Sequence, residues 1–582
     1  MTMAALLHRP GGASRRPRRT APENILGWLV LAVLSVLVGL PLLLVLAQGV
    51  APGLGLAPDW SLRPELLGEI LRRPLWQASL VNSLTLATGA MVLGGVLGTG
   101  LALLRHTVSF PGARLLDAAA WALLVSPSFV LAQGWVLFAS PSGVAVSTLG
   151  LDVSHLVFSP GGLIVIMGLI KYPFAYLAAS AALHWDDGSY RQAAALSGAR
   201  PWTVLRTVRV PLLTPAVVSG AVLVFVDVLG DFGLPAALSA AYHYPTLPYS
   251  IYASVRQSPV SFALGGVLSF YLVLIIAAAL LVYFRALRSS RYDFLTGRAR
   301  RTEPPPARWP WLWSGVTGLV LLVAFGLPLG TSLQVSLSRT LHGGPVPGNL
   351  TLEHYAEVLS SGSRMLEGMG HSLSVALGAA VLTTVLGFLV GVVLTFTRFR
   401  ARFLIDMAGT VALAVPGIVL AVGYIFLWNQ PVLASAGLAL YGQPVLLVLA
   451  GTAAALPVAV RLQLGALAQV PDSLLSAAGL SGARLATRLR TVLVPLVAPA
   501  LVSAFAAVLA SGIFDLAAAT MLAPPSYTTL PVEILLEYDR GRYGYATAGA
   551  VLSSLLVLAL AAASTILGRR LLGGAQPSGR RT

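Results

Sequence analysis

Long uninterrupted runs of apolar residues recur along the whole 582-residue chain. A helix needs about 20 apolar residues to cross the roughly 30 Å hydrocarbon layer of a membrane. Continuous runs, rather than short alternating segments, favour membrane helices over a barrel. We therefore predict an all-α integral membrane protein with about twelve spans. These lie near residues 25–48, 82–104, 115–139, 161–183, 207–234 and 262–286 in the first half, and near 309–333, 371–396, 403–428, 437–462, 491–522 and 545–568 in the second.

The composition supports this assignment. Hydrophobic residues make up 56% of the chain and charged residues only 10%, whereas about a quarter of the residues in a soluble domain are charged. The chain has no cysteine, which excludes disulfides and thiolate metal sites.

The net charge of +17 is distributed unevenly along the chain. When the loops are assigned alternately to two sides, with the N-terminus inside, most arginines fall inside, as the positive-inside rule requires. The charge therefore orients the protein and contacts anionic membrane lipids. We predict a multi-pass protein of the inner or plasma membrane with both termini cytoplasmic, and no nucleic-acid partner.

The arginine-rich N-terminal tail has two interpretations. The motif "SRRPRR" before an apolar run also fits a secretion signal with twin arginines. The run lacks a clear small-residue cleavage site, which favours an uncleaved first membrane helix.

A segment of the first half returns in the second half. Residues 191–220 align without a gap with residues 475–504 and are identical at 19 of 30 positions. "NSLTLATGA" at 82–90 likewise resembles "HSLSVALGA" at 371–379. An even number of spans separates the copies, so both lie on one face of the membrane. This predicts two parallel six-helix repeats related by a pseudo-twofold axis along the membrane normal.

The repeats define the expected domains. The stretch "RALRSSRYDFLTGRARRTEPPPARW" is rich in arginine and proline and is typical of a linker. We predict a basic cytoplasmic tail at 1–24, a first six-helix domain at 25–287, a cytoplasmic linker at 288–308, a second six-helix domain at 309–570 and a cytoplasmic tail at 571–582.

Both copies of the repeated segment fall on the arginine-rich side, between spans four and five of each half. They span residues 187–211 and 472–495. Each consists of a short surface helix, a glycine that permits a sharp turn or a close backbone approach (Gly198 or Gly482), and a basic helix that runs to a proline. Such helices anchor many membrane proteins in the headgroup layer. Anchoring does not require the same glycine, arginine and proline positions twice, whereas a twofold docking partner does.

This pattern resembles the "EAA" loop of permease subunits of binding-protein-dependent ABC importers, in which the loop forms a coupling helix that docks on the ATPase subunit. The acidic first residue of that motif is Gln192 in one copy and Ser476 in the other. The resemblance implies that ATPase docking involves Gln192, Ala193, Ala194, Gly198, Ala199, Arg200 and Pro211, and Ser476, Ala477, Ala478, Gly482, Ala483, Arg484 and Pro495.

Two further stretches indicate a subgroup. "GDFGLPAALSAAYHYPTLPYSIYASV" at 230–255 and "FDLAAATMLAPPSYTTLPVEILLEY" at 514–538 are similar to the ferric iron and thiamine permeases. The resemblance implies import of ferric iron, with thiamine, phosphonates or polyamines as alternatives.

The chain lacks an ATPase motif of its own. A Walker A loop places a lysine after glycine, but the single lysine, Lys171, follows Ile170. We therefore expect no catalytic residues, no cofactor and no metal site. The resemblance implies a separate ABC ATPase subunit in two copies and an extracytoplasmic solute-binding protein that docks on the outer loops at 49–81, 140–160 and 334–370.

Four of the charged residues inside predicted spans are candidates for a translocation path, because a charge in a membrane usually faces a partner or a cavity. Lys171 lies in the fourth span, and Asp227 and Asp231 lie late in the fifth. They form either a structural ion pair or part of a translocation path. Asp515 corresponds to Asp231 in the second half, whereas Ala455 replaces the lysine.

An aromatic cluster comprises Tyr242, His243, Tyr244, Tyr249 and Tyr252. Phenolate and imidazole groups suit ferric iron, but tyrosines also form the aromatic belt at membrane interfaces. The belt is the preferred interpretation.

A secondary transporter with two parallel six-helix repeats is the principal rival class. Such transporters typically carry a glycine, aspartate and arginine signature after the second span. The corresponding loop here is "RHTVSFPGAR", without that signature. A membrane scaffold is a third class, in which the duplicated loop has no purpose.

Overall fold

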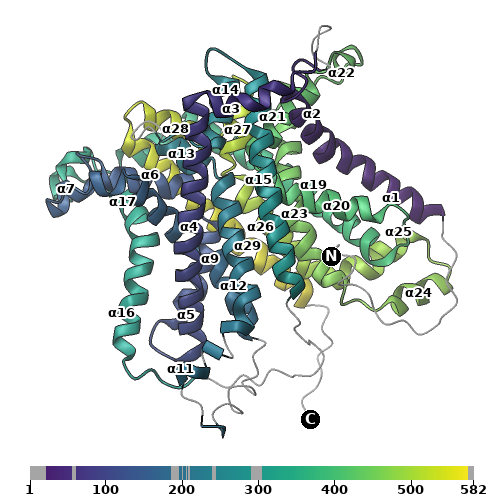
Figure 1. Cartoon of the computed structure of the whole chain (residues 1–582), viewed down its shortest axis with the longest axis horizontal. Coiled ribbons are helices and arrows are strands. Elements are labelled where there is room, and N and C mark those ends of the chain that lie inside the picture. The colour runs from purple at the N-terminus through teal and green to yellow at the C-terminus, as the bar shows by residue number, and fades with distance from the viewer. Residues whose placement is uncertain are drawn as a thin grey trace. The chain divides into compact units, whose positions relative to one another are not determined.

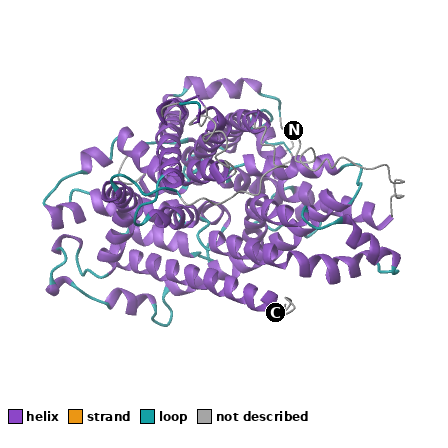
Figure 2. Ribbon diagram, turned by 90° about the horizontal axis from the view of Figure 1, so that it is seen from below, coloured by secondary structure: helices purple, strands orange, loops and turns teal. Residues whose placement is uncertain are grey.

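The structure is a computed structural model of the whole chain. It describes residues 21–54, 61–184, 196–198, 201–204, 206–207, 210–238, 244–289 and 304–573. Within these ranges the chain forms helices and loops, and the only β-type pairings are two isolated bridges, Ser109 with Pro306 and Ser338 with Leu350 (Figure 2). The prediction of an all-α membrane protein is confirmed.

Ten helical segments of the described residues are long and apolar enough to cross a membrane, or up to twelve if each of two bent pairs counts as one span. Each of the twelve predicted runs coincides with one of them. The ten are Asn24–Gln48, Pro74–Thr107, Pro160–Leu183, Leu213–Gly230, Phe262–Leu287, Pro310–Ser336, Arg364–Phe396, Pro444–Leu467, Leu485–Gly512 and Tyr543–Ser564.

The two bent pairs fall on the predicted third and ninth spans. Helix α5 (Ala113–Val125) meets α6 (Ser128–Ala139) at 102°, and α20 (Arg402–Ala414) meets α21 (Gly417–Trp428) at 117°. A proline lies within the break of each pair, at Pro127 and Pro416, and the residue before it is extended. The proline ring excludes helical geometry from that preceding residue. The third and ninth predicted spans are therefore each divided into two helices at a proline.

Shorter helices connect the long ones. They are α3 (Glu69–Arg72), α7 (Val144–Leu149), α8 (Ser154–Val157), α11 (Pro201–Val204), α13 (Gly233–Leu238), α14 (Leu247–Arg256), α18 (Glu353–Val358), α22 (Pro431–Ser435), α24 (Asp472–Leu480), α25 (Leu485–Arg488), α27 (Leu516–Leu522) and α28 (Leu530–Asp539), with 3₁₀ turns at Pro64–Gly68, Leu341–Gly343 and Pro347–Asn349.

The chain divides into two compact units. The first comprises residues 1–68, 251–270 and 353–582, and the second comprises residues 69–250 and 271–352. Helix α15 (Phe262–Ser289) contributes to both. The contiguous domains expected from the sequence stay a prediction.

The second unit is built around α4 (Pro74–Thr107), α9 (Pro160–His184) and α12 (Val210–Gly230), which pack along one another (Figure 1). Small residues permit this close packing, as is usual between membrane helices. A Cβ at Gly98 would lie 2.5 Å from the Tyr172 carbonyl oxygen, and one at Gly220 would lie 2.8 Å from the Ala175 Cα.

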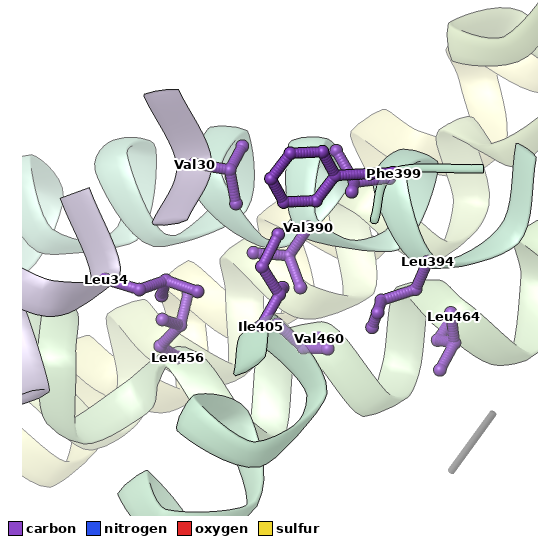
Figure 3. Close-up of a cluster of buried hydrophobic side chains, with 10 residues drawn as sticks. Val30, Leu34, Val390, Leu394, Phe399, Ile405, Leu456, Val460 and Leu464 are labelled. Carbon is purple, nitrogen blue, oxygen red and sulfur yellow. The ribbon is translucent and has the colours of Figure 1, made fainter. Parts of the chain in front are cut away.

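The first unit contains α19 (Arg364–Phe396), α23 (Pro444–Leu467), α26 (Val494–Gly512) and α29 (Tyr543–Gly573). The N-terminal helix α1 (Ala21–Leu34) also packs in this unit. Figure 3 shows Val30 and Leu34 of α1 beside side chains of α19, α20 and α23. The buried cluster consists of Val30, Leu34, Val390, Val393, Leu394, Phe399, Ile405, Leu456, Val460 and Leu464.

Each half of the sequence thus contributes its first helix to the unit that holds most of the other half. Helices α1 and α2 (Leu40–Gln48) belong to the first unit, and α16 (Pro310–Leu321) and α17 (Leu327–Ser336) belong to the second. A π-helical segment interrupts both, at Ser35–Gly39 and Leu322–Gly326. Each segment is soon followed by a proline, Pro41 or Pro328, whose missing N–H removes one helical hydrogen bond.

Candidate functional site

The second repeated loop is described completely, and its glycine ends a helix. Helix α24 stops at Leu480, and Gly482 follows in the left-handed region with φ +79°. The Gly482 N–H donates to the Gly479 carbonyl and the Ala483 N–H donates to the Ala478 carbonyl, both at 3.1 Å. These two bonds form a Schellman motif, which favours glycine because a side chain is strained at positive φ. A Cβ at Gly482 would meet nothing within 4 Å, so conformation and not space selects the glycine.

An arginine fixes the chain after this turn. The Nε of Arg488 donates to the Ala483 carbonyl oxygen at 2.7 Å. The guanidinium also lies against Gly479, where an added Cβ would be 2.9 Å from its Cζ. Helix α25 is thereby held against α24, and a π-helical segment at Leu489–Leu493 leads into α26 near Pro495.

The polar residues of this loop bond locally and remain accessible. The Ser476 hydroxyl donates to the Asp472 carbonyl at 3.0 Å, and the Ser481 hydroxyl donates to the Ala477 carbonyl at 3.1 Å. Ser476, Ala477, Gly482, Arg484 and Pro495 are partly or fully exposed, and Ala478 and Ala483 are half-buried.

The first repeated loop is described in part. Gly198 adopts φ +76°, close to the value at Gly482, and Pro211 lies in the first turn of α12. The predicted docking residues Gln192, Ala193, Ala194, Ala199 and Arg200 lie outside the described residues.

One feature of both loops escaped the sequence analysis. Leu196 is 90% exposed and Leu480 is 91% exposed. The two leucines occupy corresponding positions of the repeat, each directly before the serine that precedes a positive-φ glycine, Gly198 or Gly482. In the sequence, the leucine of "ALSGA" or "GLSGA" cannot be told from a helical leucine that faces the core. The exposure of its side chain becomes clear only from the structure of the turn.

The charged residues of the first half form one cluster inside the second unit. The Lys171 Nζ lies 2.5 Å from Asp227 Oδ2 and 3.0 Å from Asp231 Oδ2. The Asp231 side chain is 5% exposed, and its Oδ1 accepts hydrogen bonds from the Ser128 hydroxyl and the Leu234 N–H, both at 3.0 Å. The structure therefore joins the three predicted residues and adds Ser128, which lies directly after the break at Pro127.

Asp515 has a different environment in the first unit. Its Oδ1 accepts from the Ala518 N–H at 3.1 Å, so it caps α27 as Asp231 caps α13. Asp515 lines a small pocket together with Ser372, Thr529 and Gly512. Among the described residues no Lys, Arg or His is paired with it.

The aromatic cluster is only partly described. Tyr242 and His243 lie outside the described residues, and the Tyr244 hydroxyl donates to the Asn82 carbonyl at 3.3 Å. Within the described ranges, no group of three or more His, Cys, Asp or Glu residues is arranged to hold a metal ion.

Comparison with known proteins gives the family. The family model described as "Binding-protein-dependent transport system inner membrane component" matches residues 383–573. This segment contains the second repeated loop and the helices on either side of it.

Several individual relatives match more of the chain. It is 24% identical to the ferric transport system permease protein FbpB of Actinobacillus pleuropneumoniae, over 83% of this chain and 70% of the relative. It is 25% identical to a probable ABC transporter permease of Sinorhizobium fredii, over 75% of this chain and 77% of the relative.

A shorter relative shows the family at higher identity. The molybdenum transport system permease protein ModB of Escherichia coli is 30% identical, and the match covers 32% of this chain and 82% of ModB. About a third of this chain therefore matches most of a single permease, and the ferric permease FbpB matches most of the whole chain. The whole chain is thus a fused permease that resembles the ferric group. The protein therefore belongs to the family of binding-protein-dependent ABC transporter permeases, the inner membrane components of these transport systems.

Proposed function

We propose that this protein is the membrane subunit of an ATP-driven importer that receives its cargo from an extracytoplasmic solute-binding protein. The two repeated loops serve as coupling loops, and one ATPase subunit docks on each. The chain supplies the path and the mechanical linkage, and the ATPase subunits supply the energy.

One observation carries this proposal: the two loops repeat the same turn. The glycines Gly198 and Gly482 adopt φ +76° and φ +79°, and the leucines before them are 90% and 91% exposed. An exposed leucine costs free energy in water, and its burial in a partner returns about 1.5–3 kcal/mol. Two such leucines at matched positions favour a partner that is itself present twice.

Ferric iron is the proposed cargo. The support for it is the names of the relatives FbpB of Actinobacillus pleuropneumoniae and of Haemophilus influenzae, which are 24% identical to this chain. Thiamine, phosphonates and polyamines are the alternatives.

The charge cluster of Lys171, Asp227 and Asp231 serves the structure in this proposal. Asp231 caps α13 and bonds Ser128, and its side chain is almost fully buried. A group that fixes two helices is poorly suited to release a passing solute. The ammonium of Lys171 offsets the cost of burying these carboxylates.

The test is reconstitution in liposomes. Neighbouring genes that encode an ATPase and a secreted binding protein would supply the partners. Uptake of ferric iron is then measured with ATP, without ATP and with a proton gradient alone. Uptake that requires ATP and both partners supports the proposal. Uptake by the isolated chain under a proton gradient would instead identify a secondary transporter.

A second measurement addresses the cargo without the membrane. Calorimetry of the isolated binding protein with ferric iron, thiamine, a phosphonate and a polyamine ranks these solutes directly. Tight binding of a solute other than ferric iron would replace the cargo and leave the importer mechanism intact.

A further inference from the structure

The two halves of the sequence differ in how they neutralise a corresponding pair of aspartates. Asp231 and Asp515 occupy matching positions of the two repeats, and each caps the short helix that follows it. Asp231 pairs with the ammonium of Lys171 at 3.0 Å. At the corresponding positions of the second half, Ala455 replaces Lys171 and Ser511 replaces Asp227. Asp515 is therefore an acidic residue for which its own half supplies no lysine at the corresponding position.

A pocket lies beside the Asp515 carboxylate. Its wall includes Leu447 and Gly451 of α23. Residues four apart on a helix lie on the same face, so Ala455 continues the row formed by Leu447 and Gly451. The alanine side chain carries no charge that could neutralise Asp515 as Lys171 neutralises Asp231.

Two hydroxyl groups also line this pocket. Thr529 is 3% exposed, and its Oγ1 is buried with no hydrogen-bond partner. The Ser372 Oγ accepts the Leu530 N–H at 2.9 Å and retains a further lone pair. A buried hydroxyl without a partner costs about 1–3 kcal/mol, so a polar ligand in the pocket would be stabilised by Thr529.

The remaining wall restricts the size and charge of that ligand. Val375, Ala376, Ala379 and Leu447 line the pocket with apolar atoms. The accessible space holds about one water-sized ligand. A divalent ion there would leave one uncompensated positive charge among apolar side chains, which is costly. A monovalent cation balances the single carboxylate.

We propose that Asp515, Thr529 and Ser372 bind one small monovalent cation, such as sodium, potassium or ammonium, through a carboxylate and two hydroxyl oxygens. The bound ion does for the second half what the Lys171 ammonium does for the first. It neutralises the capping aspartate and stabilises the junction between α26 and α27. This site is independent of the cargo and of the ATPase.

The experiment is a thermal unfolding series on the purified full chain in detergent, without partners or cargo. Chloride salts of sodium, potassium and ammonium are compared at constant ionic strength with those of tetramethylammonium and N-methylglucamine. A ligand that binds only the folded state raises the midpoint with its concentration. We expect at least one of the small cations to raise the midpoint by about 2 °C or more. The bulky cations should have no such effect.

Three variants locate the effect. Asp515→Asn should abolish the rise, and Asp152→Asn, the same change at an exposed residue, should retain it. Thr529→Val keeps the side-chain shape and should raise the half-saturating cation concentration about tenfold. Ala455→Lys supplies an internal ammonium and should make the midpoint independent of the cation.

Two results would overturn the site: a wild-type midpoint that ignores the identity of the cation, or an Asp515→Asn variant that keeps the full rise. If Asp515→Asn does not fold, Thr529→Val decides the question, and unchanged half-saturation in that variant also refutes the site. Because no ATP or cargo is present, these results do not depend on whether the importer proposal holds.

Discussion

Gly423 packs its bare Cα against the backbone carbonyl of Pro41, so closely that an added Cβ would lie 2.4 Å from the carbonyl oxygen. Gly134 makes the same contact with the carbonyl of Pro328. Each glycine lies on the helix that follows a proline break, α21 or α6. Each proline lies just after the π-helical segment that interrupts the first helix of its half. The two contacts hold the exchanged first helices α2 and α17 against α21 and α6.

Replacing Gly423 should therefore loosen the first helix. Gly423→Val places a branched side chain against main chain that has little freedom to move, and such overpacking costs about 1–3 kcal/mol. We expect a lower midpoint of thermal unfolding in detergent. Gly409→Val is the matched control, because a Cβ at Gly409 of α20 would meet nothing within 4 Å. Equal midpoints for the two variants would show that the close contact does not stabilise the protein.

The positive φ of Gly482 leads to a second prediction. Gly482→Ala strains the turn by about 1–2 kcal/mol, so the affinity for the ATPase subunit should fall about tenfold while membrane insertion is unchanged. Gly465→Ala on α23 is the control, because that glycine is helical and unobstructed. The measurement is ATPase binding to detergent-solubilised protein. Unchanged binding by Gly482→Ala would argue against a docking role for the turn.

The exposed leucines should supply part of the docking energy. Leu480→Ser removes an apolar side chain that is 91% exposed in the isolated subunit. Loss of its burial should weaken ATPase binding by about tenfold or more, and adding Leu196→Ser should weaken it further. Leu438→Ser changes a leucine that is 53% exposed outside the loops and serves as the control. The idea fails if the double variant binds the ATPase as the wild type does.

The Lys171 cluster predicts a partial rescue. Lys171→Met leaves Asp227 and Asp231 without their cation, and removing one partner of a buried pair costs about 3–5 kcal/mol. Adding Asp231→Asn removes one of the two carboxylates left without a cation, so the double variant should be more stable than Lys171→Met alone. Thermal unfolding measures this coupling, and uptake assays separate it from transport. If the stable double variant transports nothing, the cluster belongs to the translocation path.

Glu533 on α28, outside the long spans, predicts a dependence on pH. It is 1% exposed, and burial, together with the nearby Glu537, raises the pKa of its carboxyl above the ordinary value of 4.5. The folded protein then holds this proton at pH values where the unfolded chain has lost it. The contribution of Glu533 to the free energy of unfolding therefore falls as the pH rises from 4.5 through the raised pKa.

Glu533→Gln should remove that loss. Compared with the wild type, the variant should gain stability as the pH rises above 4.5, until the Glu533 carboxyl of the folded wild type has lost its proton. The measurement is the midpoint of thermal unfolding as a function of pH, from 4.5 upwards. Glu65→Gln removes the same charge from an exposed residue and should leave the wild-type pH profile in place. A Glu533→Gln profile that parallels the wild type would assign the pH dependence to other groups.

The sequence by itself determined the helical class and the repeat, because the length of an apolar run and a constant offset between two copies are local or one-dimensional properties. It also indicated the turns at Gly198 and Gly482, since the helix-ending conformation depends on the glycine and its nearest neighbours. The duplicated loops thus allowed a functional prediction before any contact was known.

Only the tertiary structure decided which distant segments meet. The exchange of the first helices, the bond of Ser128 to Asp231 and the pocket at Asp515 all depend on partners far away in the sequence. Apolar spans are interchangeable in composition, so hydropathy does not specify which of them pack together. Small residues in close contact specify it, and a glycine in the sequence does not reveal what it will touch.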